Sequence, residues 1–155
     1  LLVEDNPADV DLTRESFEDA KIMNNLDAVA DGVDAMAFLR REGHYADKPV
    51  PDLILLDLNL PRKGGHELLS EIRREPAFRD IPVIIMTSSE AEADVVKAYN
   101  LQANGYVTKP VDLAGFMTIV HAIETFWISV VNARKRFVMC PDLFPGAVHA
   151  SDSNS

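Results

Sequence analysis

The chain has 155 residues, of which 47% are hydrophobic and 26% charged, a composition that predicts one folded domain and argues against a disordered segment. Its 15 basic and 25 acidic side chains give a net charge of −10, which argues against a nucleic acid or an anionic membrane surface as the main partner. No apolar run reaches the roughly 20 residues of a transmembrane helix, and the single cysteine, Cys140, leaves no internal disulfide. These features fit a reducing, cytoplasmic location.

Strands and helices alternate along the sequence. The apolar residues 1–3 predict a strand that begins before the first residue, and Asn6 with Pro7 predicts a helix start, because Asn caps helices and Pro fits their first turn. Two apolar runs, over 53–56 and 81–86, predict strands covered on both faces, as parallel strands are. The other predicted elements are strands over 26–30 and 105–107 and helices over 33–41, 67–74, 90–99 and 113–131. The alternation predicts an α/β fold with a doubly wound, five-stranded parallel sheet of order 2-1-3-4-5.

Polar side chains follow the predicted strands at the point where each strand ends. In an open parallel sheet these carboxyl ends lie at one edge, where ligands bind. The side chains are those of Glu4 and Asp5 after the first strand, Asp57 after the third, Thr87 after the fourth and Lys109 after the fifth. We therefore expect three carboxylates, a hydroxyl and an ammonium group to meet at this edge.

Asp57 directly follows four apolar residues, so its carboxylate needs a partner, because burying a lone charge is costly. Glu4 and Asp5 carry the same charge and would raise the pKa of one or more of these carboxyl groups. A divalent cation removes the repulsion, and carboxylate, carbonyl and water oxygens are the ligands that Mg²⁺ prefers. With Lys109, such a cation would neutralise a phosphoryl group during in-line transfer to Asp57 as the nucleophile.

Four segments together resemble the receiver domain of two-component response regulators. They occur in the order and spacing of that family, and the resemblance covers residues 1 to about 126. The segments are Glu4–Pro7, Leu55–Pro61 with Gly65, Met86–Ser88 and Tyr106–Pro110. The resemblance implies that a histidine kinase donates a phosphoryl group to Asp57. Such a protein would catalyse only its own phosphorylation and its own dephosphorylation.

The resemblance also implies a set of Mg²⁺ ligands. Asp5 and Asp57 would bind the ion directly. Glu4 would act through a water molecule, and Asn59 would contribute its backbone carbonyl. Lys109, outside this set, would pair with the phosphoryl oxygens instead.

Two further residues would report phosphorylation, by the same resemblance. The hydroxyl of Thr87 would turn toward the phosphoryl group, and Tyr106 would move from an outward to an inward position behind it. A phosphoryl group adds about −1.5 to −2 charges and three acceptor oxygens, which is enough to bias such a two-state element. The surface around the fifth strand and the last helix would then change shape and alter protein binding.

The resemblance ends near residue 126, so we expect a receiver domain over 1–126 and a C-terminal extension over 127–155. The extension would be partly helical and then a disordered tail, too short for a DNA-binding or enzymatic output domain. This predicts a stand-alone receiver that acts through protein contacts. The loop from Glu42 to Asp52 and the pair Phe126–Trp127 are similar to small single-domain regulators paired with bacterial phytochrome-type kinases. That finer likeness implies a light-sensing kinase as the phosphoryl donor.

An apolar stripe runs along the last predicted helix. Its residues recur at helical spacing, at Ile123, Trp127, Val130 and Val131. The last helix of a receiver usually ends earlier, so part of the stripe would extend beyond the sheet. Exposed apolar surface with aromatic side chains is typical of partner contacts. We therefore expect a homodimer through the last helix and its extension.

Three other functions compete with a phosphorylated receiver. A haloacid-dehalogenase-type phosphatase needs a second Asp two residues after the nucleophile, where this chain has Asn59. A flavodoxin-like electron carrier shares the fold but needs a hydroxyl-rich phosphate loop, whereas residues 4–9 are acidic. A receiver-like module that binds proteins without phosphate stays open as the main alternative.

Overall fold

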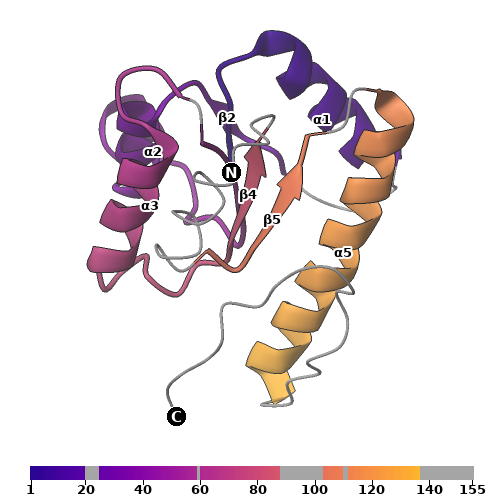
Figure 1. Cartoon of the computed structure of the whole chain (residues 1–155). Helices are drawn as coiled ribbons and strands as arrows, with labels where there is room; N and C mark the ends of the chain where they lie inside the picture. Colours follow the sequence, from indigo (N-terminus) through magenta and orange to yellow (C-terminus); the bar gives the residue numbers. More distant parts are fainter. Residues whose placement is uncertain (20–24, 59, 88–102, 110–111, 137–155) are drawn as a thin grey trace.

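The structure, a computed structural model, describes residues 1–19, 25–58, 60–87, 103–109 and 112–136; for Thr87, Tyr106 and residues 126–136 it describes the backbone alone. Strands and helices alternate within these ranges, as Figure 1 shows. The strands are β1 (Leu2–Val3), β2 (Ala28–Val29), β3 (Ile54–Asp57), β4 (Val83–Thr87) and β5 (Gly105–Thr108). The helices are α1 (Pro7–Asp19), α2 (Gly32–Leu39), the 3-10 helix η1 (Gly43–Tyr45), α3 (Gly65–Arg74) and α5 (Leu113–Arg136). The helix predicted over 90–99 lies outside the described residues.

The strands form one parallel sheet of order β2-β1-β3-β4-β5, which confirms the predicted topology. The central strand β3 pairs with β1 on one side and with β4 on the other, so that Leu55 lies between Leu2 and Ile84. The strand order reverses at β1, which lies between β2 and β3. Ligands of doubly wound sheets bind at such a reversal, outside the carboxyl ends of the strands.

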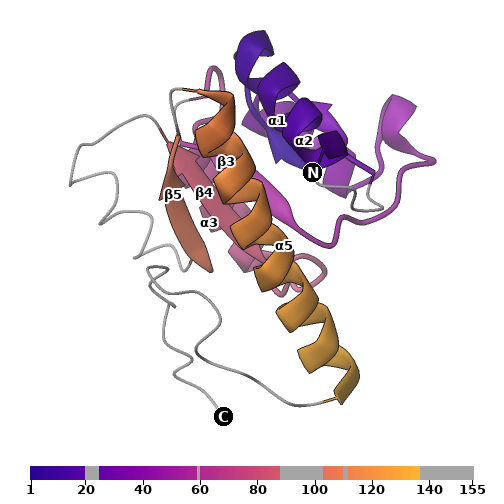
Figure 2. The same cartoon turned by 90° about the vertical axis from the view of Figure 1, so that its right-hand side faces the viewer.

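Helices cover both faces of the sheet. Figures 1 and 2 show α2 and α3 on one face and α1 and α5 on the other. In β3, Ile54 and Leu56 join the apolar cluster that includes α2 and α3, whereas Leu55 packs with Phe116 and Ile123 of α5. All five side chains are at most 2% exposed. Burial on both faces explains why this strand is apolar at successive positions instead of alternating.

Side-chain caps begin two of the helices. The N–H of Ala8 donates to Asn6 Oδ1 at 3.0 Å at the start of α1. The N–H of Asp34 donates to Asp31 Oδ1 at 2.8 Å at the start of α2. Each bond satisfies a backbone N–H that has no partner within its own helix. Both helices therefore begin where a short polar side chain follows a strand.

Several boundaries differ from the predicted ones. Asp57 is the last residue of β3 and pairs in register with Met86, instead of following the strand. α5 continues to Arg136, because residues 132–136 contain neither Gly nor Pro to end it. It crosses residue 126 without a break, so the division of the chain at this point stays a prediction. Among the described helices, none combines the length and the apolarity needed to cross a bilayer.

Candidate functional site

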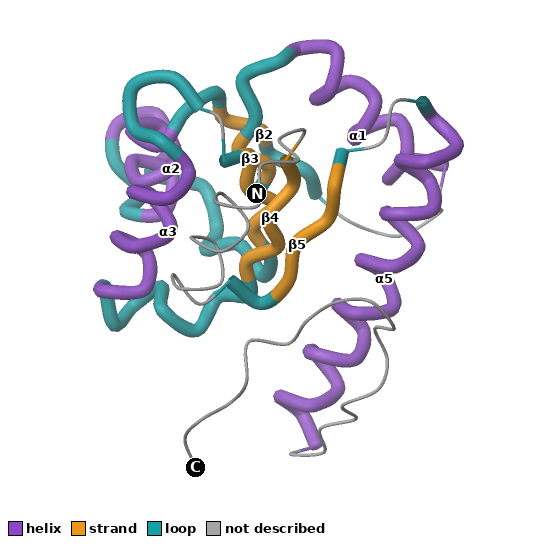
Figure 3. Tube along the Cα trace, viewed as in Figure 1, coloured by secondary structure: helices purple, strands orange, loops and turns teal. Residues whose placement is uncertain are grey.

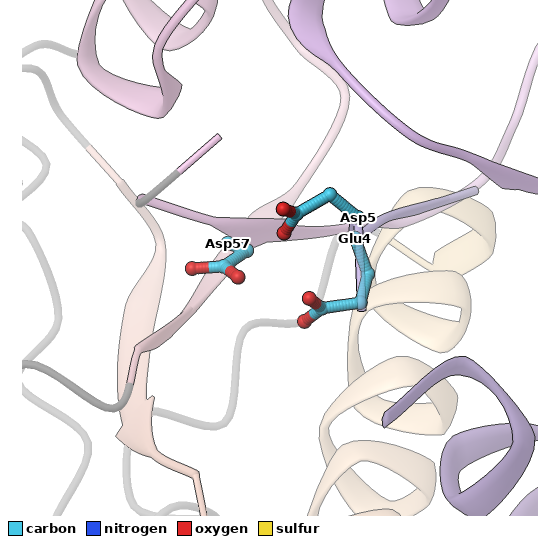
Figure 4. Close-up of side chains that lie close together, drawn as sticks. All are labelled: Glu4, Asp5 and Asp57. Atoms are coloured by element: carbon cyan, nitrogen blue, oxygen red, sulfur yellow. The ribbon is translucent and has the colours of Figure 1, made fainter. Parts of the chain in front are cut away.

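Three carboxylates meet at the edge of the sheet where β1 and β3 end. Glu4 and Asp5 directly follow β1, and Asp57 is the last residue of β3. An oxygen of each lies within 4.8 Å of the others, and Figure 4 shows the three side chains pointing toward a common space. Glu4 and Asp57 are 4% and 5% exposed, whereas Asp5 is open to solvent. We call these three residues the carboxylate cluster.

The chain turns sharply after Asp57, and a glycine makes the turn possible. The N–H of Gly65, the first residue of α3, donates to the carbonyl of Leu58 at 3.2 Å. A Cβ atom on Gly65 would lie 2.6 Å from the Asp57 carbonyl oxygen and from Leu58 Cα. Both neighbouring atoms belong to the backbone and cannot rotate away. Glycine therefore allows α3 to pack directly against the end of the strand that carries Asp57.

An ion pair ties the segment between β3 and α3 to the start of α2. Arg62 Nε donates to Asp31 Oδ2 at 2.7 Å, and the N–H of Gly32 donates to the Lys63 carbonyl at 3.3 Å. Asp31 is 5% exposed. Burial disfavours its charged form, but the Asp34 N–H and the Arg62 guanidinium outweigh this effect and lower the pKa of Asp31. Asp31 is therefore ionised at neutral pH and holds the segment that follows β3.

Lys109 brings a positive charge to the carboxylate cluster from the end of β5. Its Nζ donates to Asp57 Oδ2 at 2.9 Å and to Asp9 Oδ2 at 3.1 Å, and it forms a close ion pair with Glu4. The Lys109 side chain is 8% exposed. An ammonium group has three donor hydrogens, which matches these three carboxylates. Segments that lie far apart in the sequence are thus joined through one nitrogen atom.

Burial and charge shift the acid–base properties of this site in opposite ways. Burial raises the pKa of Glu4 to about 7; hydrogen bonds from Lys109 and from the Asn6 N–H oppose the rise, and the charge of Asp57 adds to it. Burial also disfavours the Lys109 ammonium, but hydrogen bonds to Asp57 and Glu4 outweigh burial and raise the pKa of Lys109. The lysine therefore stays charged. Its single positive charge cannot neutralise all the carboxylates around it when they are ionised.

The donor set of the carboxylate cluster fits a hard divalent cation. Carboxylate oxygens are the ligands that Mg²⁺, Ca²⁺ and Mn²⁺ take in proteins. The open side at Asp5 leaves room for the water molecules that Mg²⁺ retains. A cation would also relieve the repulsion that opposes ionisation of the buried Glu4. Asn59, the fourth ligand implied by the sequence, lies outside the described residues.

The two predicted switch residues are placed by their backbone only. Thr87 is the last residue of β4 and pairs in register with Thr108, and Tyr106 pairs with Ile85. Thr87 therefore belongs to the same edge of the sheet as Asp57, whose register partner is the preceding residue of β4. The side chains of Thr87 and Tyr106 lie outside the described part of the structure, so their roles stay predictions.

Asp9 is a site residue that the sequence reasoning missed. It belongs to the acidic residues 4–9, whose charge argues against a flavin phosphate but does not by itself place Asp9 beside Lys109. In the structure Asp9 lies in the first turn of α1, and its carboxylate contacts the Lys109 ammonium. The available signal was its position two residues after the start of a helix that directly follows Glu4 and Asp5. Such a helix begins at the edge of the sheet, so its first turn faces the site.

Comparison with known proteins gives the same assignment over most of the chain. Residues 1–121 match the response regulator receiver domain family. The response regulator Rcp1 of Synechocystis sp. is 45% identical over 132 residues, which cover 85% of this chain and 90% of Rcp1. The crystal structure of the phosphorylated cyanobacterial phytochrome response regulator RcpA is 46% identical, with a TM-score of 0.77 over 83% of this chain and 92% of RcpA. The Mn²⁺-bound form of Rcp1 is 42% identical, with a TM-score of 0.75 over 90% of this chain and 96% of Rcp1.

The sheet order, the carboxylate cluster with its lysine and the sequence match agree with one another. The match to Rcp1 covers 85% of this chain and 90% of Rcp1, so it is not confined to the short segments around the site. The chain belongs to the response regulator receiver family.

Proposed function

We propose that this response regulator is switched by a phosphoryl group that a histidine kinase transfers to Asp57. The observation that carries the proposal is the pairing of the buried Asp57 carboxylate with the Lys109 ammonium, 2.9 Å away, inside the carboxylate cluster. This arrangement provides a nucleophile, a positive charge for the incoming oxygens and carboxylates that suit a divalent cation. The phosphorylated state of the related RcpA supports the same reading.

Mg²⁺ is the cofactor we propose, held by Asp5 and Asp57, with Glu4 acting through water and the Asn59 carbonyl as a further ligand. The Mn²⁺-bound form of Rcp1 supports a divalent cation in this family. Bound there, the ion supplies positive charge against the oxygens of the phosphoryl group during transfer. Asp5 is the exposed member of the cluster, so it faces the side from which hydrated ions arrive.

The transfer itself needs few protein groups. A carboxylate oxygen of Asp57 attacks the phosphorus of the kinase phosphohistidine, a P–O bond forms, and the P–N bond breaks to release the histidine. Lys109 exchanges its contact with Asp57 for one with the phosphoryl oxygens, where its charge stabilises the product. Hydrolysis by water later returns Asp57 to a carboxylate and releases phosphate. The protein thus catalyses both steps on itself alone.

The output of the switch is a changed protein-binding surface. Thr87 would donate its hydroxyl to the new oxygens, and Tyr106 on the neighbouring strand would move inward behind it. Both residues lie on β4 and β5, next to α5 in the fold, so their movement would reshape the surface around these elements. The downstream partner is a protein, in keeping with the net charge of −10.

We also propose two specific partners, which membership of the receiver family does not define: the kinase that donates the phosphoryl group and a second copy of this chain. RcpA is a phytochrome response regulator, which supports a light-sensing, phytochrome-type histidine kinase as the donor. We place this transfer in the cytoplasm, because the single cysteine suits a reducing compartment. The length of α5, which runs to Arg136, supports a homodimer through this helix and the residues after it. A molecular mass by light scattering that stays that of the monomer at every concentration, with and without phosphorylation, contradicts the dimer.

Labelling with acetyl phosphate tests the central proposal. The wild type should gain a slower band on a phosphate-affinity gel in the presence of Mg²⁺, and chelation should abolish the band. Asp57→Asn should show no such band. Asp52→Asn, an exposed aspartate two residues before the start of the same strand, is the matched control and should behave as the wild type. A band that survives in Asp57→Asn means another acceptor, and no band in any protein favours the phosphate-independent binding module.

A further inference from the structure

The Lys109 ammonium has three carboxylate partners, and they are not equivalent. Glu4 and Asp57 belong to the carboxylate cluster, whereas Asp9 does not. The Asp9 carboxylate lies 3.1 Å from Lys109 Nζ and belongs to the first turn of α1, a helix that contributes no residue to the carboxylate cluster. The Asp9 side chain is 25% exposed and that of Lys109 8% exposed, so the pair is only partly screened by water.

This difference matters once a cation and a phosphoryl group are present. Glu4 would then act on the cation through water and Asp57 would carry the phosphoryl group, so both would have less negative charge to offer Lys109, and the cation would repel a neighbouring ammonium. Asp9 is the partner that keeps its charge free for Lys109. Because a lysine side chain has four rotatable bonds, an anchor on a helix restricts where the ammonium can lie.

We propose that Asp9 is a positioning residue, which holds the Lys109 ammonium beside Asp57 so that it meets the incoming phosphoryl oxygens. The inference rests on the proposed phosphorylation of Asp57. Asp9 lies outside the carboxylate cluster and would act through Lys109. The helix that follows the first strand thereby contributes to the chemistry, although its residues are not part of the carboxylate cluster.

Labelling rates with acetyl phosphate measure the effect of Asp9. Asp9→Ala should label about threefold to tenfold more slowly than the wild type, the loss expected for one charge-assisted hydrogen bond. The change should appear in the maximal rate rather than in the concentration of acetyl phosphate that gives half of it. Asp9→Glu, which keeps the charge, should recover part of the rate. Asp11→Ala, an exposed residue of the same helix, is the matched control and should label as the wild type.

A double-mutant cycle shows whether Asp9 acts through Lys109. In the Lys109→Met background, Asp9→Ala should have no further effect on the slow residual labelling. The urea midpoints of the same four proteins, measured without Mg²⁺, provide a second cycle that needs no labelling. They should also be non-additive, because the two residues contact each other. Additive effects in both cycles overturn the proposal.

Two other results separate the alternatives. The Mg²⁺ affinity of Asp9→Ala, measured by calorimetry, should match that of the wild type, whereas Asp5→Ala should weaken it. If Asp9→Ala loses as much Mg²⁺ affinity as Asp5→Ala, Asp9 is a cation ligand, which contradicts the positioning role. Faster labelling of Asp9→Ala means that Asp9 only repels the anionic donor. If the wild type itself is not labelled, the proposed function fails, which is distinct from a labelled wild type with no Asp9 effect.

Discussion

Glu4 and Lys109 illustrate how burial makes single charges dependent on one another. Their side chains are 3% and 8% exposed, so neither is fully hydrated. Removing one partner of a buried ion pair leaves an uncompensated charge, which costs more than the pair itself contributes. The same reasoning applies to Asp57, which shares the ammonium of Lys109. Glu4 and Asp57 therefore depend on the same lysine for their counter-charge.

Substitution of Lys109 tests this balance. Lys109→Met should lower the free energy of unfolding by about 3 kcal/mol in the absence of divalent cations, because the carboxylates lose their counter-charge. Added Mg²⁺ should restore much of the loss, and chelation should bring it back. Lys48→Met removes an ion pair with Asp27, 2.9 Å away, whose side chains are 44% and 30% exposed, and should cost less than about 1 kcal/mol. Urea unfolding with and without Mg²⁺ measures both variants; equal losses that ignore Mg²⁺ contradict the account.

At the scale of elements, the connection from β3 to α3 positions the end of the strand. Gly65 gives this connection its close approach, whereas no atom of the described residues lies within 4 Å of the position that a Cβ atom on its neighbour Gly64 would take. Asp31 and Arg62 hold the same connection from the side of α2. The strand that carries Asp57 is therefore held by contacts with α3 and with the start of α2, in addition to its own pairing in the sheet.

The two glycines allow a paired test of the close approach. Gly65→Ala should destabilise the protein by about 2 kcal/mol, because the added methyl group overlaps backbone atoms that cannot move independently. Gly64→Ala should cost less than about 1 kcal/mol, since only the helix cap changes. Thermal unfolding of the two variants measures the difference. Similar losses for both substitutions would show that the contact between α3 and the end of β3 is not constraining.

The Asp31–Arg62 pair predicts a dependence on pH. Because the folded protein holds the pKa of Asp31 below its usual value of 3.8, its charged form stabilises the fold at higher pH. This contribution is complete above pH 3.8 and is lost as the pH falls through the lower pKa of the folded state. Asp31→Asn, which keeps a capping side chain, should therefore cost about 1 kcal/mol at pH 7. Urea unfolding should show the difference between the two proteins shrinking as the pH falls below 3.8; a constant difference contradicts the ion pair.

At the scale of the whole molecule, the sheet separates two apolar layers. Ile72 of α3 lies in the layer with Ile54 and Leu56, and Ile123 of α5 lies in the layer with Leu55. Ile72 and Ile123 are at most 2% exposed. Side chains on opposite faces of a sheet share no direct contact. The two layers should therefore respond independently to substitution.

Removing one buried methyl group from each layer tests this independence. Ile72→Val and Ile123→Val should each lower the free energy of unfolding by about 1 kcal/mol, the usual cost of one buried methyl group. In the double variant the two losses should add within about 0.5 kcal/mol. Urea unfolding of the four proteins gives the comparison. A coupling clearly larger than this means that the sheet transmits strain between its faces.

The sequence was sufficient for the architecture because the signals were local. Continuous apolar runs and capping residues identify strands and helix starts, and the alternation of elements leaves few possible topologies. Glu4, Asp57 and Lys109 could be grouped because each lies at the carboxyl end of a strand of one parallel sheet. Asp9 could not, because its place depends on how far α1 turns before it meets the end of β5. The end of α5 was misjudged because its apolar stripe stops before the helix does.

The 24 residues of α5 correspond to a length of about 36 Å, whereas strands of four or five residues span less than about 17 Å. Figure 3 shows the C-terminal part of α5 extending past the strands. The helix therefore acts as a lever arm: its first turn follows β5 near the site, and its last turns extend beyond the sheet. A tilt of about 10° at its first turn would move its last turn by about 6 Å, so small changes near Lys109 are magnified at Arg136.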